Sequence, residues 1–86
     1  MPSAEFEAAA TAANNFTTKP TDDELLKLYA LYKQATVGDV NTARPGIFDM
    51  KGKYKWDAWE SEKGKSQEEA EVEYIALVEE YKVKYA

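Results

Sequence analysis

The chain has 86 residues, with 11 cationic and 16 anionic side chains and with neither cysteine nor histidine. This length suits one domain, and we expect residues 1–86 to form it. The composition excludes disulfide bonds, thiolate or histidine zinc sites, and any enzyme whose nucleophile or base is a cysteine or a histidine.

The charge is distributed unevenly along the chain. Residues 25–56 carry six cations against two anions, whereas the remainder carries five cations against fourteen anions. A basic middle in an acidic chain does not suit nucleic acid, whose binders present long basic surfaces. It suits one compact anion that is held locally, so we expect a small anionic ligand and no nucleic-acid partner.

The apolar residues are spread along the chain and do not gather in one long run. No stretch approaches the ~18 apolar residues of a membrane span, and no basic start precedes an apolar run. The mean hydropathy of -0.64 agrees with a water-soluble protein. We therefore expect no stable membrane insertion and no secretory signal. The lack of cysteine fits a reducing compartment, and we expect a cytoplasmic protein.

The first helix is predicted over residues 4–15. Ser3 is a suitable N-cap residue. Apolar residues then recur at helical spacing, many of them alanines, which favours close packing against another helix. These residues are Phe6, Ala9, Ala10, Ala13 and Phe16. We expect this face to meet the fourth helix through Tyr74, Ile75 and Val78.

The second helix is predicted over residues 22–36. Thr21 and Glu24 have the spacing of a capping box, and Gly38 can take the left-handed position that ends the helix. At ~100° per residue, the polar side of this helix is narrow. Its predicted members are Asp23, Lys27, Ala30 and Gln34. The wide apolar remainder indicates either extra core or the lining of a groove.

Two tyrosines and a lysine stand together on the second helix. Tyr29 and Lys33 are four residues apart and share one face, with Tyr32 beside them. A phenol ring next to an ammonium group suits a planar base that carries a phosphate. The alternative is a core helix with one solvated lysine.

Residues 37–50 are predicted to form a loop, which is long for a connection between two helices. Such a length allows the next helix to run parallel to the second one. Ile47, Phe48 and Met50 are large and apolar, and they predict that part of this loop is buried.

The third helix is predicted over residues 51–62. Lys51 and Lys55 share one face, and Trp56 and Trp59 lie on a neighbouring face that we expect to be core. Three lysines stand within the first five residues of this helix. Cations oppose the macrodipole at a helix N-terminus, and an anionic ligand would offset that cost.

The fourth helix is predicted over residues 66–84. Ser66 and Glu69 have the spacing of a second capping box. One face is apolar, and it comprises Ala70, Tyr74, Leu77, Val78, Tyr81 and Tyr85. The many glutamates on the other faces lack the loop that a cation site uses, so we interpret them as a solvated surface and expect no metal.

Three motifs carry a resemblance to a known family. They are Tyr-Ala-Leu-Tyr-Lys-Gln-Ala-Thr-Val-Gly-Asp at residues 29–39, Arg-Pro-Gly at residues 44–46, and Lys-Trp-Asp-Ala-Trp at residues 55–59. With these motifs the chain closely resembles the acyl-CoA-binding protein family over essentially its whole length. The resemblance implies an all-α four-helix bundle with a long connection between helices 2 and 3. It also implies a monomeric, non-catalytic carrier of medium- to long-chain acyl-CoA esters that needs no cofactor.

The resemblance implies nine ligand-binding positions. Those that hold the 3′-phosphate of CoA match Tyr29, Lys33 and Lys55. Those that contact the adenine or the rest of the head group match Tyr32, Tyr74 and Lys51. Those near the acyl chain match Leu25, Leu26 and Met50.

The chain departs from the family pattern at two of the ligand-facing positions. Asn14 stands where many members have a lysine that reaches the ligand, so the sequence leaves that contact open. Met50 replaces a common aromatic residue, which would alter the packing around the acyl chain.

Two other classes of function compete with the carrier. A helical protein-interaction module would use the surplus apolar surface of the second helix as a groove for a partner. An enzyme such as a thioesterase would need a carboxylate or a lysine as its catalytic group, and no constellation in the chain suggests one. We therefore expect no catalytic residue.

Overall fold

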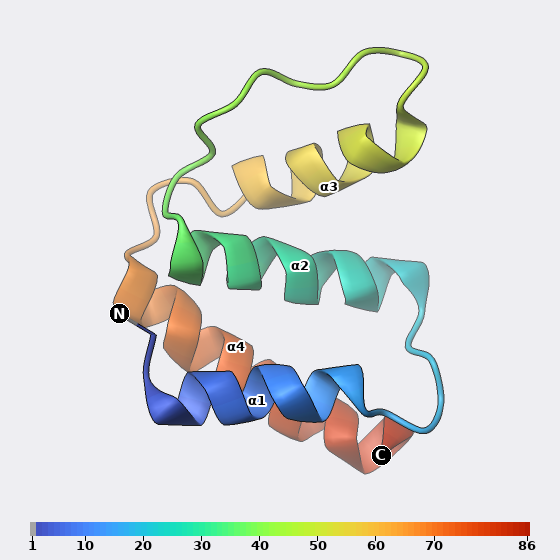
Figure 1. Ribbon diagram of the computed structural model, residues 1–86, viewed down its shortest axis with the longest axis vertical. Helices are drawn as coiled ribbons and strands as arrows, with labels where there is room; N and C mark the ends of the chain where they lie inside the picture. Colours follow the sequence, from blue (N-terminus) through green and yellow to red (C-terminus); the bar gives the residue numbers. More distant parts are fainter. Residues whose placement is uncertain (1) are drawn as a thin grey trace.

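The computed structural model describes residues 2–86, which contain four α-helices and no strand. The helices are α1 (Ala4–Asn14), α2 (Asp22–Thr36), α3 (Met50–Glu60) and α4 (Gln67–Tyr85) (Figure 1). Every predicted helix is present, with both ends within two residues of the predicted ones. The all-α architecture with a long α2–α3 connection is therefore confirmed.

Capping side chains determine where the helices begin. The Ser3 hydroxyl accepts a hydrogen bond from the first turn of α1, as predicted. Thr21 and Glu24 form the complete capping box of α2, each side chain accepting from the other's backbone N–H. The second predicted box is only half formed. Ser66 accepts from the backbone N–H of Glu69, but the Glu69 carboxylate accepts from the Ser66 hydroxyl.

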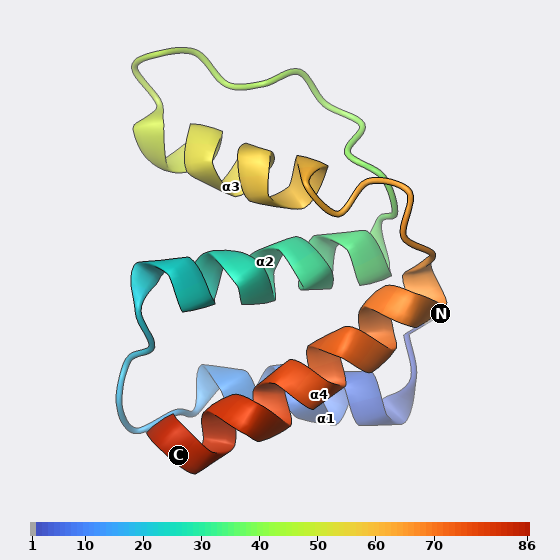
Figure 2. The same cartoon turned by 180° about the vertical axis from the view of Figure 1, so that it is seen from behind.

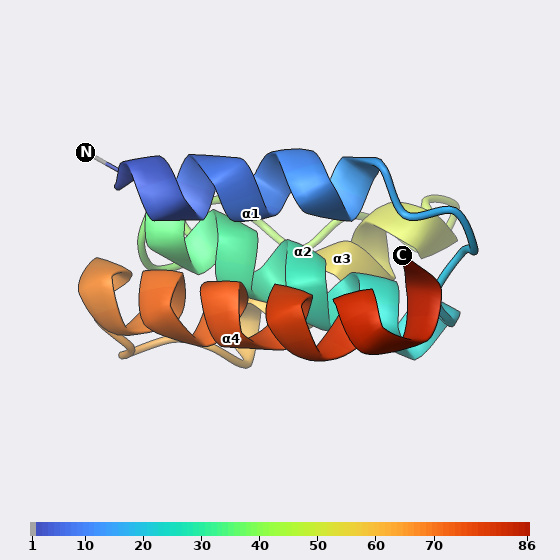
Figure 3. The same ribbon diagram turned by 90° about the horizontal axis from the view of Figure 1, so that it is seen from below.

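The four helices are arranged around α2. This helix packs against α3 on one side and α4 on the other, and α1 packs against α4. Figures 1 and 2 show the resulting order, with α3 and its loop on the far side of α2 from the α1–α4 pair. α2 and α3 run in the same direction, as the long loop predicts, and α1 and α4 also run parallel (Figure 3).

The core lies between α1, α2 and α4. Phe6 is almost fully buried, and its ring centroid is 4.9 Å from that of Tyr74. Val78 is buried beside them, while Ala10, Ala13 and Ile75 are partly buried against the same cluster. The predicted packing of α1 on α4 is therefore confirmed.

Two predictions about buried polar and aromatic residues are wrong in part. Ala30 and Gln34 were expected on the polar side of α2, but both are buried because α2 has neighbours on two sides. The Gln34 amide donates hydrogen bonds to Asp39 Oδ1 and to the Lys65 carbonyl, which offsets the cost of burial. Of the two tryptophans, Trp59 is buried as predicted, whereas Trp56 is only half-buried.

The prediction of a partly buried loop is also wrong. Ile47, Phe48 and Met50 have exposed fractions of 70%, 100% and 48%. The loop follows the outer edge of α3, and no other helix of residues 2–86 lies beyond it (Figure 1). These side chains therefore have no element to pack against. Gly38 begins the loop with a φ of +99°, the left-handed conformation that was predicted for it.

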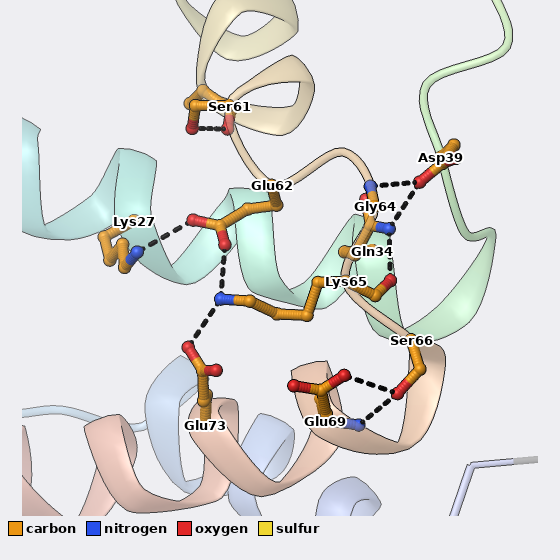
Figure 4. A network of polar contacts seen from close by, with 11 residues as sticks. Lys27, Gln34, Asp39, Ser61, Glu62, Gly64, Lys65, Ser66, Glu69 and Glu73 are labelled. Atoms are coloured by element: carbon orange, nitrogen blue, oxygen red, sulfur yellow. Dashed lines mark hydrogen bonds and ion pairs between the residues drawn. The ribbon is translucent and has the colours of Figure 1, made fainter.

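A polar network joins α2, the α3–α4 turn and α4 (Figure 4). The buried Glu62 carboxylate accepts from Lys27 Nζ at 2.7 Å and from Lys65 Nζ at 2.6 Å, and Lys65 also reaches Glu73. Burial alone would raise the pKa of Glu62, but the two ammonium groups outweigh it and hold the pKa below its ordinary value. The turn after α3 is thereby fixed in place.

None of the helices within residues 2–86 has both the length and the apolar character that crossing a membrane requires.

Candidate ligand-binding site

An open pocket lies between the N-terminal halves of α2 and α3. We call it the α2–α3 pocket, and its volume is about 590 Å³. Its lining combines cations with an apolar floor, and comprises Lys19, Asp22, Leu25, Leu26, Tyr29, Lys51, Tyr54 and Lys55. α2 supplies the floor, α3 supplies two lysines and a tyrosine, and the α1–α2 connection supplies Lys19.

A second pocket of about 290 Å³ lies on the neighbouring side of α2, and we call it the α1–α2 pocket. Its lining comprises Ala10, Ala13, Asn14, Leu25, Leu28, Tyr29, Tyr32 and Tyr74. Leu25 and Tyr29 line both pockets, so the two hollows adjoin along one stretch of α2. An elongated ligand can therefore cross α2 and occupy both.

A cation and a phenol meet where the two pockets adjoin. Lys55 Nζ lies 5.3 Å from the ring centre of Tyr29, so that α3 delivers an ammonium group to the tyrosine face of α2. Lys33 follows Tyr29 by one helical turn, but its Nζ lies 4.9 Å from the centre of the Trp59 ring. The structure thus brings Tyr29 and Lys55 together, and it places Lys33 over a neighbouring ring.

Tyr32 and Tyr74 form one wall of the α1–α2 pocket, and the buried Phe6 ring packs against both of them. The Tyr32 ring is stacked on Phe6, with an interplanar angle of 24° and centroids 5.5 Å apart. The Tyr74 ring lies 5.9 Å from that of Tyr32. Tyr32 nevertheless has an exposed fraction of 41%, so part of its ring remains available for a planar ligand group. Burial, with a smaller contribution from Tyr32, raises the pKa of Tyr74 to about 12 and keeps its hydroxyl a donor at neutral pH.

Most of the nine predicted site residues line these two pockets. Seven do so, namely Leu25, Leu26, Tyr29, Tyr32, Lys51, Lys55 and Tyr74. Lys33 and Met50 line neither pocket. Met50 begins α3 with half of its surface exposed, and the next turn of the helix presents Tyr54 to the α2–α3 pocket.

Several lining residues were missed by the sequence reasoning. Tyr54 follows Lys51 by three residues and could have been found from the face that Lys51 and Lys55 share. No sequence pattern pointed to Lys19 and Asp22, because their place in the pocket lining depends on how the α1–α2 connection turns. Asn14 was known only as a departure from a family pattern, and it lines the α1–α2 pocket.

The two pockets suit an amphiphilic anion. Lys19, Lys51 and Lys55 place three cations around the α2–α3 pocket, against one carboxylate from Asp22, while leucines line the floor. Charge-assisted hydrogen bonds from lysine favour a phosphate, and the leucines favour an alkyl chain. Within residues 2–86, the acidic side chains form no group of three or more that could hold a metal ion.

Comparison with protein families and curated relatives gives one consistent result. A family model described as Acyl CoA binding protein matches residues 3–78. The acyl-CoA-binding protein of Saccharomyces cerevisiae is 64% identical over 81 residues, which cover 94% of this chain and 93% of that protein. The acyl-CoA-binding protein homolog of Drosophila melanogaster is 56% identical over 86 residues, which cover the whole of both chains.

Solved structures agree with the sequence comparisons. The crystal structure of Oryza sativa acyl-CoA-binding protein 2 superposes with a TM-score of 0.85 and 51% identity, covering 88% of this chain and 84% of that one. The solution structure of acyl coenzyme A binding protein from yeast gives a TM-score of 0.75 and 65% identity, covering 93% of each chain.

Proposed function

The chain belongs to the acyl-CoA-binding protein family, and we propose that it carries medium- to long-chain acyl-CoA esters as a monomer in the cytoplasm. The family match and its relatives support acyl-CoA binding and transport, and they place the chain among binding proteins and not among enzymes. Acyl-CoA is then the ligand, and no cofactor is required. The proposed functional unit is a single domain over residues 1–86.

The head group of the ligand is proposed to lie where the two pockets adjoin. Tyr29 and Lys55 contact the 3′-phosphate, because the Lys55 ammonium group already lies against the Tyr29 ring. Lys33 joins them by leaving the Trp59 ring. A cation–π contact is worth about 0.5–2 kcal/mol, depending on how far it is desolvated, whereas a hydrogen bond to a charged group contributes about 1.5–3 kcal/mol. The phosphate is therefore the stronger partner for the Lys33 ammonium.

The rest of the head group follows the two walls of the site. The exposed part of the Tyr32 ring offers a stacking surface for adenine, with Phe6 packed against the ring from the core. Tyr74 lines the same pocket and is proposed to contact the head group there. Lys51 lies in the α2–α3 pocket with Lys55 and is proposed to contact the remaining phosphates.

The acyl chain is proposed to lie in the α2–α3 pocket against Leu25 and Leu26. Both side chains are partly exposed on the pocket floor. Met50 was expected beside them, but Tyr54 lines the pocket from α3 and Met50 does not. Each buried CH₂ contributes roughly 0.8 kcal/mol, so affinity rises with chain length until the floor is covered.

A groove for a partner helix is a weaker interpretation of the same surface. Most of the apolar surface of α2 is covered by α3, α4 and the core residues of α1, including Leu28 and Leu31. The part that remains open is ringed by lysines, which suits an anionic small molecule better than an apolar helix.

The observation that carries this proposal is that Lys55, Tyr29 and two leucines line the same pocket. The test is a calorimetric titration with a long-chain acyl-CoA and with free CoA. We expect the acyl-CoA to bind far more tightly and with a negative heat-capacity change, because the tail buries apolar surface. Equal affinities would contradict the tail pocket. Intact thioester after long incubation would distinguish a carrier from a thioesterase.

A further inference from the structure

A patch of exposed apolar side chains stands at the start of α3. Ile47 and Phe48 lie in the preceding turn, and Met50 and Tyr54 lie one turn apart on α3. Their exposed fractions are 70%, 100%, 48% and 55%. We call these four residues the tip patch. Contiguous exposed apolar surface of this kind marks a site of interaction.

The turn that carries the tip patch does not itself need apolar residues. The backbone N–H of Asp49 donates to the Gly46 carbonyl at 3.0 Å, so Ile47 and Phe48 are the two central residues of a closed turn. Small and polar residues are favoured at such positions. A fully exposed phenyl ring contributes nothing to this fold, which leaves its role to be explained by a contact outside the chain.

The tip patch is held in a fixed position relative to α3. The Asp49 side chain accepts from the backbone N–H of Gly52 and caps the helix. Arg44 forms two hydrogen bonds with Asp57, at 2.8 and 2.9 Å, and the Trp56 indole N–H donates to the loop backbone. The loop is thereby attached along α3, so little conformational freedom is lost when the patch binds.

Lysines flank the patch on both sides. Met50 and Tyr54 share one face of α3, and at ~100° per residue Lys51 and Lys53 lie on either side of that face. Lysine stems can lie along apolar surface while their ammonium groups reach a polar layer. Apolar anchors between cations are the arrangement by which proteins bind an anionic bilayer surface. The glutamate-rich α4 lies on the far side of α2, away from this surface (Figure 2).

We propose that the tip patch docks the protein reversibly on anionic lipid bilayers. The Phe48 ring enters the boundary between headgroups and acyl chains, and Lys51 and Lys53 contact the lipid phosphates. A second copy of the chain is a poorer partner, because its own lysines would face these across the contact. The docking surface stands independently of the acyl-CoA proposal.

Docking has a consequence for the α2–α3 pocket. Tyr54 belongs to both the tip patch and the pocket lining, and Lys51, which flanks the patch, also lines the pocket. A docked molecule therefore has its pocket mouth at the bilayer. An acyl-CoA ester partitions into bilayers through its tail and would be collected or released there. This delivery role rests on the proposed function.

The test measures vesicle binding without acyl-CoA, using vesicles of phosphatidylcholine alone and vesicles that also contain phosphatidylserine. We expect binding to the anionic vesicles that weakens as salt is added. Phe48→Ser should lower the partition coefficient by about tenfold, the equivalent of about 1.4 kcal/mol from partial burial of the ring. Val83→Ser is the matched control, because Val83 is 89% exposed on α4 and should leave vesicle binding unchanged.

Two charge-reversal variants test the role of the lysines in vesicle binding. Lys53→Glu should weaken binding to anionic vesicles, whereas Lys63→Glu, on the turn at the other end of α3, should have little effect. Equal vesicle binding by wild type and Phe48→Ser would overturn the proposal. So would a concentration-dependent dimer that Phe48→Ser abolishes, because it would assign the patch to a second copy.

Acyl-CoA titration of the same variant separates the two proposals. Phe48 lines neither pocket, so Phe48→Ser should keep wild-type affinity for acyl-CoA. Loss of acyl-CoA binding in this variant would assign Phe48 to the ligand site and overturn the docking surface. Wild type that docks on vesicles but does not bind acyl-CoA would instead refute the proposed function alone.

Discussion

The ammonium group of Lys55 lies 5.3 Å from the ring centre of Tyr29, although 26 residues and a long loop separate the two in the chain. The contact exists because α3 runs parallel to α2 and presents its first turns to the N-terminal half of that helix. Cation and phenol thus share one edge of an apolar pocket, which is the arrangement that a phosphate-bearing amphiphile requires.

Removal of the Tyr29 hydroxyl tests whether the phenol contributes a hydrogen bond to the ligand. Tyr29→Phe keeps the ring under Lys55 and deletes only the hydroxyl. We expect acyl-CoA affinity to fall by about 0.5–1.5 kcal/mol, or somewhat more if the partner is the charged phosphate. Calorimetry measures the change, and thermal unfolding of the free protein should be unaffected. An unchanged affinity would show that Tyr29 contributes only its ring.

Substitutions of Tyr54 and Met50 should affect binding of the acyl chain to different extents. Tyr54 lines the α2–α3 pocket and Met50 does not, so Tyr54→Ala should weaken long-chain acyl-CoA binding more than Met50→Ala does. The expected loss for Tyr54→Ala is about 1 kcal/mol, because part of its ring would lie against the tail. Titration with a series of tail lengths should show a loss that grows with length and vanishes for free CoA. A larger loss of affinity in Met50→Ala would show that Met50, and not Tyr54, lies against the acyl chain.

The packing of α1 on α4 depends strongly on Phe6. This ring is 1% exposed and touches the rings of Tyr32 and Tyr74. Phe6→Ala should lower the free energy of unfolding by about 3–5 kcal/mol. The same substitution at Phe48, which is fully exposed, should change it by less than about 0.5 kcal/mol. Denaturant unfolding of the two variants measures both values, and a similar small loss in each would contradict the packing.

The C-terminus of α4 is attached to α2 through Glu24, and this contact is sensitive to acid. Hydrogen bonds from Lys84 and then Tyr85 lower the pKa of Glu24 to about 2, from an ordinary value of 4.5. Because the pKa is lower in the folded state, the contribution to stability is complete above the ordinary value and is lost as pH falls from about 4.5 to 2.

Glu24→Gln tests this contribution while keeping a residue type that suits a capping box. The variant should be less stable than wild type at pH 7, and the difference should shrink as the pH is lowered through that window. Unfolding midpoints at several pH values measure it. Glu79→Gln is the control, because Glu79 is exposed and its ion pair is with Lys82 on its own helix. A pH-independent difference for Glu24→Gln would contradict the assignment.

The helices could be predicted from the sequence because their signals are local. Ser3, Thr21 and Ser66 cap helices wherever those helices pack, and the spacing of Phe6 and Ala10 defines a face without reference to its partner. The spacing of Tyr29 and Lys33 likewise places both on one side of α2.

The remaining features depend on contacts between distant segments. Gln34 looks solvated on a helical wheel but is buried by the turn after α3, where Lys65 supplies its partner. Phe48 looks like a core residue, yet the loop follows an outer edge with no neighbour. Periodicity reports which residues share a face, and only tertiary structure decides what covers that face.

Calorimetric titration with acyl-CoA and acyl-dephospho-CoA is the most direct test of a 3′-phosphate site at Tyr29 and Lys55. Wild type should bind the 3′-phosphorylated ligand more tightly. Lys55→Ala should lose about 1.5–3 kcal/mol of binding free energy for acyl-CoA and little for the dephospho ligand. Lys33→Ala should show the same pattern. Lys53→Ala is the matched control, because Lys53 lies on α3 but lines neither pocket. Equal wild-type affinity for both ligands, or equal losses in Lys55→Ala, would contradict a 3′-phosphate site at Tyr29 and Lys55.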